Sequence, residues 1–187
     1  MDFFSGDHHF GHTRIIEHCN RPFSDLEEMT DVLIDNHNER VRHKDTVFLV
    51  GDMGYRLPPR YLAQYLSRMR GKKKLLAGNH DRKIIKKARN KGLFRTMIRS
   101  GELQLLGDLH EYFVTLPSER LRIVLCHYPI HSWNARTHGA WHIHGHSHGK
   151  IPKLPRRVDC GVDVWNYYPV SLEEALATDD RLYAASA

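Results

Sequence analysis

Short apolar runs alternate with helical patterns through the first half of the chain. Residues 1–5, 46–50 and 74–77 are apolar or β-branched runs, and each is followed by a glycine. Runs of this length that end at a glycine are typical of buried strands. Three strands are therefore expected, separated by segments long enough to hold helices.

Helical signatures fill the gaps between these strands. Residues 24–27 (Ser-Asp-Leu-Glu) form a capping-box pattern ahead of apolar residues at helical spacing. A proline pair at 58–59 suits the first turn of a second helix, and residues 81–91 predict a third helix that ends at Gly92. The expected order is strand, helix, strand, helix, strand, helix.

The pattern becomes rich in strands in the second half of the chain. Strand-like runs occupy residues 109–116, 121–126, 141–144 and 158–164, and a second capping box at 171–174 predicts a C-terminal helix. An α/β half followed by a strand-rich half indicates two sheets packed together with helices outside.

The composition is that of an ordinary globular protein. The chain has 187 residues, of which 41% are hydrophobic and 27% charged, and this predicts a single domain over residues 1–187. Its apolar runs are shorter than the roughly 18 residues of a membrane helix, and the opening Met-Asp-Phe-Phe lacks the basic start of a signal peptide. A cytoplasmic protein without a membrane partner is expected.

Cysteine and charge narrow the chemistry further. The three cysteines are widely spaced, which argues against a disulfide framework or a zinc knuckle. The net charge of +6 favours anionic ligands, and 11 of the basic residues lie between Arg68 and Lys91. These could steer a polyanion such as nucleic acid, although a solvated helix face would also place lysines there. The oligomeric state is left open.

The 15 histidines are the unusual feature, because several of them follow predicted strands. Five strand ends deliver carboxylate, imidazole or amide groups, and in open α/β sheets ligands bind beyond the carboxyl ends of strands. The candidate metal ligands are Asp7, His9, Asp52, Asn79, His127, His146 and His148.

The number and spacing of these residues suggest two metal ions. Asp7 and His9 are two residues apart after a strand and could point to the same side, and His146 and His148 repeat that spacing. Seven ligands exceed the four of one zinc ion but suit two cations about 3.5 to 4 Å apart that share a carboxylate. Asp52 is the expected bridge. Mixed nitrogen and oxygen ligands favour Mn, Fe, Co, Ni or Zn, with Mn²⁺ the expected activator in vitro.

The ordered set D-x-H, G-D, G-N-H-D, H and G-H-x-H between residues 7 and 148 resembles the calcineurin-like metallophosphoesterase superfamily. The stretch 7–23 is similar to a small bacterial and phage branch of it. The resemblance implies a four-layer α/β-β/α sandwich of two mixed sheets flanked by helices. It also implies a catalytic His80 that faces the phosphate, with Asp81 orienting it. The implied ligands of one metal are Asp7, His9, Asp52 and His148, and those of the other are Asp52, Asn79, His127 and His146.

The expected reaction is hydrolysis of a phosphodiester or phosphomonoester by a hydroxide that bridges the two metals. Candidate substrate contacts are His12, Arg14 and Arg21, with Arg136 as a further candidate. A metal-dependent nuclease is an alternative that rests on the basic flank. A non-catalytic binding module is disfavoured because every ligand position is retained, and a histidine-rich metal store would predict scattered or contiguous histidines.

Overall fold

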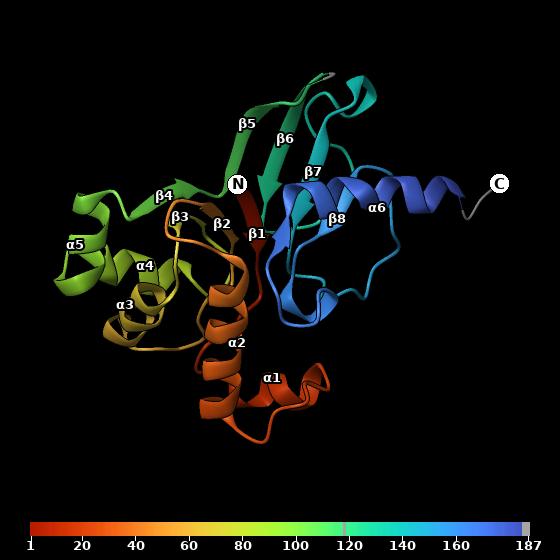
Figure 1. The fold of residues 1–187 in the computed structure, drawn as a ribbon. Helices are drawn as coiled ribbons and strands as arrows, with labels where there is room; N and C mark the ends of the chain where they lie inside the picture. Colours follow the sequence, from red (N-terminus) through yellow and green to blue (C-terminus); the bar gives the residue numbers. More distant parts are fainter. Residues whose placement is uncertain (118, 185–187) are drawn as a thin grey trace.

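The computed structural model describes residues 1–117 and 119–184, and side chains as far as residue 178. Its first sheet has the strand order β4-β3-β2-β1-β9 (Figure 1). The first four strands in the chain are parallel, and β9 runs antiparallel to β1. These strands are β1 (Asp2–Ser5), β2 (Thr46–Val50), β3 (Lys72–Leu76), β4 (Leu103–Gly107) and β9 (Val170–Ser171). The three expected strands are confirmed, and β4 and β9 were not predicted.

The second sheet has the order β5-β6-β7-β8, with an antiparallel first pair and parallel later pairs. Its strands are β5 (Leu109–Thr115), β6 (Arg120–Cys126), β7 (Trp141–His144) and β8 (Arg157–Asp159). The strand predicted over 158–164 is wrong beyond Asp159, because Val162 donates its backbone N–H to Gly6 of the first sheet and a 3₁₀ turn, η2 (Val162–Val164), follows.

Five helices lie on the side of the first sheet that faces away from the second (Figure 1). They are α1 (Thr13–His18), α2 (Leu26–Arg40), α3 (Pro59–Arg68), α4 (Arg82–Ala88) and α5 (Gly92–Ser100). The third predicted helix corresponds to α4 and ends at Ala88, earlier than expected. Gly92 does not end this helix but begins α5. The sixth helix, α6 (Leu172–Ala184), starts at the predicted capping box, where Ser171 and Glu174 exchange hydrogen bonds.

The cap of α2 lies one residue later than the pattern predicted. Asp25 is the N-cap, and its Oδ1 accepts hydrogen bonds of 2.9 Å from the backbone N–H groups of Glu27 and Glu28. Ser24 instead donates its own N–H and hydroxyl to the Glu28 carboxylate. The reciprocal geometry of a capping box is kept, because an acid in the first turn still reaches back to the residues before the helix.

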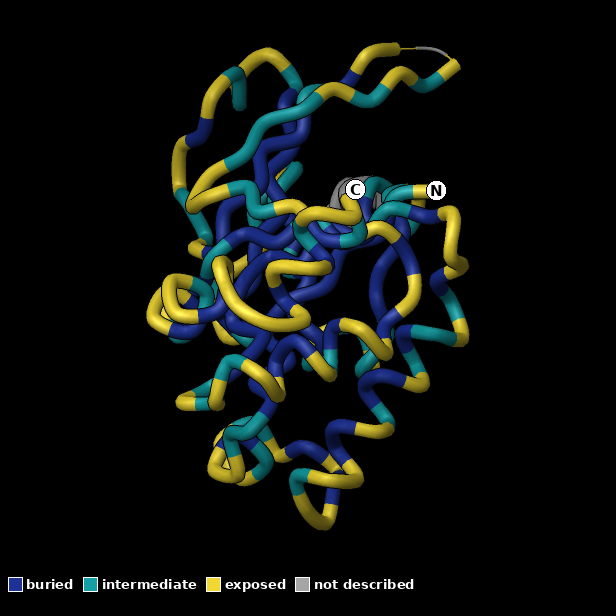
Figure 2. The backbone as a smooth tube through the Cα atoms, turned by 90° about the vertical axis from the view of Figure 1, so that its left-hand side faces the viewer, coloured by how far each residue is buried: buried dark blue, intermediate teal, exposed yellow. Residues whose placement is uncertain are grey.

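Side chains of the first sheet alternate between two apolar cores, as expected for residues on opposite faces of a strand. Phe3 and Val47 pack under the helices α1 to α5, whereas Phe4 and Phe48 face the second sheet, with their rings 5.4 Å apart. Ile123 and Ile143 of the second sheet complete the core between the sheets. Figure 2 shows this buried backbone in the middle of the molecule.

The outer face of the second sheet is covered differently. Val124 is packed under Trp133 and Ala140 of the loop 128–140, which contains the 3₁₀ turn η1 (Arg136–His138). His142 of β7 fixes this loop, since its Nε2 accepts from the N–H of Ile130. Two mixed sheets flanked by helices are therefore confirmed, but over Val124 a loop takes the place of the expected outer helical layer.

The parallel arrangement brings the carboxyl ends of β1, β2 and β3 to one edge of the first sheet. A backbone hydrogen bond from Asp7 to Gly51 and a bond from Gly6 to Cys160 join these ends to each other and to the chain after β8. Within the described residues, no helix combines the length and apolar character that crossing a membrane requires.

Candidate metal centre

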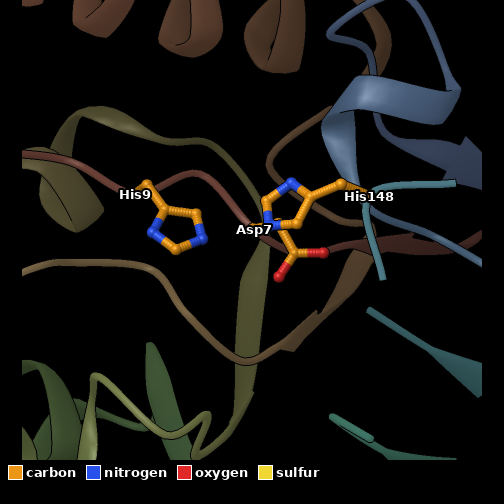
Figure 3. A group of neighbouring side chains, drawn as sticks. All are labelled: Asp7, His9 and His148. Carbon is orange, nitrogen blue, oxygen red and sulfur yellow. The ribbon is translucent and has the colours of Figure 1, made fainter. Parts of the chain in front are cut away.

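The predicted ligands come together at this edge in two groups. Ligand atoms of Asp7, His9 and His148 lie within 4.8 Å of one another, and Figure 3 shows these side chains gathered around one space. Asp52, His127 and His146 form the second group under the same criterion. The seventh predicted ligand, Asn79, places its Oδ1 3.1 Å from Nε2 of His127. Each group could hold a metal ion.

Asp52 lies between the two groups. Its Oδ2 is 3.8 Å from Nε2 of His9 and 3.4 Å from Nε2 of His127, and its Oδ1 accepts a 2.9 Å hydrogen bond from the backbone of His80. Burial is the largest single influence and opposes ionisation, but the hydrogen bond and charge of His127, the backbone N–H of His80 and the charge of His9 together outweigh it, and the pKa of Asp52 is lowered to about 2. The carboxylate is therefore ionised and faces both groups, as expected of a bridge.

Five of the ligands have left-handed backbone conformations. The φ angles are 58° for Asp7, 54° for His9, 53° for Asp52, 67° for His146 and 48° for His148. Such residues cost about 1 to 3 kcal/mol each unless glycine, and they cluster at functional sites. The candidate ligands therefore converge because the backbone turns through left-handed conformations. The alternation of side chains along a strand, on which the prediction was based, does not account for their convergence.

Two glycines allow the loops to approach the carboxylates closely. A Cβ on Gly78 would lie 2.1 Å from Oδ1 of Asp52, and a Cβ on Gly161 would lie 2.6 Å from Oδ2 of Asp7. Both distances are far below van der Waals contact, so a side chain at either position would push the ligand away. Gly161 was not predicted as part of the site, because it lies in a run that reads as a strand.

His9 carries the clearest sign that a cation fits. Its Nε2 is buried without a hydrogen-bond partner among the described residues, although it faces Asp52. Burial lowers the pKa of His9 to about 2, so this imidazole is neutral and has a lone pair to offer. Its Nδ1 lies 3.3 Å from Nδ1 of His12, and a proton shared there leaves Nε2 free. An unpaired imidazole nitrogen beside two carboxylates is the donor set that divalent transition metals prefer.

In the second ligand group, a hydrogen bond on one ring nitrogen of His127 likewise directs the other ring nitrogen toward the site. Nδ1 of His127 donates to the carbonyl of Val50 at 2.9 Å, which directs Nε2 toward Asp52 and Asn79. Burial alone would lower the pKa of His127, but the hydrogen bond to the Asp52 carboxylate raises it. In metal sites, a histidine ligand usually donates the N–H of one ring nitrogen to a carbonyl or carboxylate, and this hydrogen bond directs the other nitrogen toward the metal.

Arg21, predicted as a substrate contact, is instead buried and holds the residues of the first group in place through hydrogen bonds. Its buried guanidinium donates two 2.8 Å hydrogen bonds to Asp163 and a third to the carbonyl of Asp7 at 2.7 Å. Asp163 in turn bonds Nδ1 of His148 at 2.6 Å, and this raises the pKa of His148 against the lowering effect of burial. Asp163 was missed because it comes from η2, after the run that had been predicted as a strand.

Asp81 also has a role other than the predicted one. Its fully buried carboxylate accepts backbone N–H groups from Met53, Gly54 and Gly78, so it ties the loops after β2 and β3 together and is not bonded to the His80 ring. Burial raises the pKa of Asp81 to about 6. His80 is instead flanked by Tyr55, whose ring meets it edge-on at 4.8 Å.

The remaining predicted contacts divide between site and surface. His12 stacks on Tyr55 with ring centroids 3.9 Å apart, and burial and the nearby His80 lower its pKa to about 4. Arg14 is exposed on α1. Arg136 donates to the carbonyl of His131 and lies over the Trp133 ring, so it is engaged within the loop 128–140. Of the predicted substrate contacts, His12 is the one that adjoins the ligands.

Comparisons with known proteins fit this architecture. No protein-family model matches the chain. The uncharacterized protein MJ1445 of Methanocaldococcus jannaschii is 31% identical over 179 residues, which cover 91% of this chain and 86% of that protein. The gene 66 protein of Mycobacterium phage D29 is 27% identical over 191 residues, with 88% of each chain covered. The crystal structure of the protein of unknown function AQ665 from Aquifex aeolicus has a TM-score of 0.64 at 19% identity and covers 93% of this chain and 96% of its own. This likeness shows that the fold is shared.

The pairing of Asp163 with His148 predicts a loss of metal affinity when Asp163 is changed. The Asp163→Asn variant should bind Mn²⁺ about 10- to 100-fold more weakly, because His148 loses the carboxylate that orients it. Isothermal titration calorimetry of the metal-stripped protein measures this. Asp31→Asn, which alters an exposed ion pair with Arg68, is the matched control and should bind as the wild type does. Unchanged affinity in Asp163→Asn would contradict the role of Asp163.

The cluster also predicts that metal affinity falls as the pH is lowered. Burial raises the pKa of Asp7 to about 7, so below neutral pH a cation must displace a proton from this carboxyl. Competition by the Asp7 proton alone weakens binding by about tenfold per pH unit below the pKa, and protonation of His127 and His148, whose pKa values are raised, adds to this loss. Mn²⁺ titrations at pH 8 and pH 6 should therefore differ by roughly that factor. Equal affinity at both pH values would show that Asp7 is not a ligand.

Proposed function

The chain belongs to the same family as the uncharacterized protein MJ1445 of Methanocaldococcus jannaschii, and we propose that it is a binuclear metal-dependent phosphoesterase. One observation carries the proposal: the Asp52 carboxylate faces both ligand groups, with its Oδ2 3.8 Å from Nε2 of His9 and 3.4 Å from Nε2 of His127. The resemblance of the ordered motifs to the calcineurin-like metallophosphoesterase superfamily supports the same reading, and so does the two-sheet arrangement.

Two divalent cations match the donor set. Asp7, His9, His148 and Asp52 would hold one, and the other would be held by Asp52, Asn79, His127 and His146. When bound, the cations supply Lewis-acid polarisation of the phosphoryl group and a water nucleophile of lowered pKa. Imidazole, carboxylate and amide donors favour Mn, Fe, Co, Ni or Zn over Ca or Mg, and Mn²⁺ is the activator we propose for assays.

His80 is the side chain we propose as the proton donor. Its Nε2 lies 3.8 Å from Oδ2 of Asp52, and 34% of the side chain is exposed, so the ring borders the ligand cluster and is open to a substrate. In that position it would hold a proton against the departing oxygen, a contribution of about 10² to 10⁴ in rate. Tyr55, between His80 and His12, limits the movement of both rings and acts as a positioning residue.

The other candidate functions are less well supported. A non-catalytic module needs no exposed histidine beside a bridging carboxylate, and here His80 occupies that place. A metal store would spread its histidines, whereas these form two compact groups. A nuclease would use the same site chemistry, and the observation that favours it is the basic surface described in the next subsection.

Hydrolysis of a chromogenic ester tests the proposal. Metal-stripped protein resupplied with Mn²⁺ should hydrolyse bis-p-nitrophenyl phosphate or p-nitrophenyl phosphate, and the ratio of the two rates identifies the diester or monoester preference. Asp52→Asn should abolish turnover because Asp52 is the proposed ligand that the two metals share, and its Oδ2 faces both His9 and His127. His80→Ala should lower kcat by about 10² to 10⁴ and leave Mn²⁺ binding intact.

The matched control is His43→Ala, an exposed histidine in the loop before β2, and its activity should equal that of the wild type. A His80→Ala protein with full kcat would remove His80 from the reaction. Full metal loading without turnover of either ester would contradict the phosphoesterase proposal and favour a binding role.

A further inference from the structure

Helices α4 and α5 form a surface of a single charge. Residues 82–99 contain eight Lys and Arg residues and no Asp or Glu, and all eight are exposed. Arg82 pairs with Asp108 at 3.1 Å, and among the described residues the other seven have no acidic partner. The seven are Lys83, Lys86, Lys87, Arg89, Lys91, Arg95 and Arg99.

An ordinary solvated helix face does not account for this. The helix α2 differs in the sign of its charge: it carries Glu27, Glu28, Asp31, Asp35 and Glu39 and a single arginine, Arg40, at its end. Clustered like charges repel one another and destabilise the folded state, whereas mixed charges keep a helix soluble without that cost. A face that bears eight cations and no acid is therefore typical of one that meets an anionic partner.

The charged face begins at the candidate metal centre. Asp81, the residue before α4, ties the ligand loops together, and His80 precedes it. Residues after Asp52 contribute further cations at the same place, because Arg56 lies in the loop before α3 and Arg60 lies in its first turn. A polyanion lying on α4 would therefore reach the bridging carboxylate without crossing an intervening element.

A groove continues the surface away from the centre. It has a volume of about 630 Å³ and is lined by Arg60 at the start of α3, Lys87 on α4, and Lys91 and Leu93 near the start of α5. No acidic residue lines it, and its floor includes the apolar Phe94. Cationic walls over an apolar floor suit a strand whose phosphates and bases face different sides.

Aromatic rings alternate with these cations. The guanidinium of Arg56 lies 5.3 Å from the centre of the Tyr55 ring, and that of Arg60 lies 4.8 Å from the centre of the Tyr61 ring, which is 38% exposed. Stacking of bases on tyrosine and arginine is worth about 1 to 3 kcal/mol per base and tolerates any sequence. Interleaved aromatic and basic residues of this kind distinguish nucleic acid from a simple phosphate polymer.

We propose that this surface, from Tyr55 through the groove to Lys91, binds single-stranded nucleic acid and presents one of its phosphodiester bonds to the metal centre. The inference rests on the proposed function, since it names the substrate class of that same site. Backbone phosphates lie along α4 and the walls of the groove, and a base stacks on the exposed Tyr61 ring. The other faces of the molecule are not required for binding.

Fluorescence anisotropy of a labelled single-stranded oligonucleotide of about 12 nucleotides tests this surface. The full chain is titrated in EDTA, so that cleavage cannot consume the probe, between about 50 and 200 mM salt. The triple variant Lys83→Gln, Lys87→Gln, Lys91→Gln should reduce the slope of log K against log salt by roughly two, because each lost phosphate contact removes about 0.7. The corresponding triple arginine variant should keep the wild-type slope.

The matched control removes the same charge from the opposite edge of the first sheet. Arg42→Gln, Lys44→Gln, Lys72→Gln changes three exposed cations before β2 and at the start of β3, and it should bind as the wild type does. If both triple glutamine variants bound the oligonucleotide equally weakly, or if neither bound it more weakly than the wild type, the proposed binding surface would be wrong. Tighter binding of inorganic polyphosphate than of the oligonucleotide would overturn the choice of nucleic acid.

The two proposals fail separately. The Lys83, Lys87, Lys91 glutamine triple should hydrolyse bis-p-nitrophenyl phosphate as the wild type does, because these lysines lie outside the ligand groups. Oligonucleotide binding with the expected variant pattern but no ester hydrolysis would contradict the phosphoesterase proposal alone. Ester hydrolysis with no oligonucleotide binding would contradict the surface alone.

Discussion

The Asp52 carboxylate is the point on which the rest of the site depends. It lies two residues after the end of β2, accepts a hydrogen bond from the backbone N–H of His80, and faces His9 from one ligand group and His127 from the other. The close approach of Gly78 leaves no room for a side chain against it. Because burial disfavours a carboxylate, its ionisation is maintained by the hydrogen bonds that it accepts, and a shared anion of this kind is what two neighbouring cations require.

The fold supplies the support that such a cluster needs. Left-handed backbone at Asp7, His9 and Asp52 is costly, and it is held by two buried polar anchors beneath the ligands. Arg21 joins the carbonyl of Asp7 to Asp163, and Asp163 orients His148. On the other side, a buried carboxylate after β3 collects three backbone N–H groups from the loops around Asp52. Hydrogen bonds within the protein therefore fix the positions of the candidate ligands.

Much of this site could be predicted from the sequence, because residues that follow strands in a parallel sheet must meet at one edge. The seven candidate ligands and the first three strands were predicted in this way, and the structure brings those seven residues together. The anchors were not found: Arg21 has the chemistry of a phosphate contact, and its burial against Asp163 depends on a contact between residues 142 positions apart. The resemblance to a known superfamily implied that Asp81 orients His80, whereas the Asp81 carboxylate accepts hydrogen bonds from the backbone of three loop residues. The basic residues around Asn79 and His80 were noted in the sequence, but the groove that Arg60 of α3 and Lys87 of α4 line together appears only when the two helices are packed side by side.

The central claim is that one carboxylate joins two metal positions. Anomalous diffraction from crystals of the protein grown with Mn²⁺ tests it most directly, because it counts the metals and locates them relative to the ligands. The account predicts two peaks per chain, one beside Asp7, His9 and His148 and one beside His127 and His146, with Asp52 contacting both. A single peak, or two peaks of which one lies away from Asp52, would contradict it.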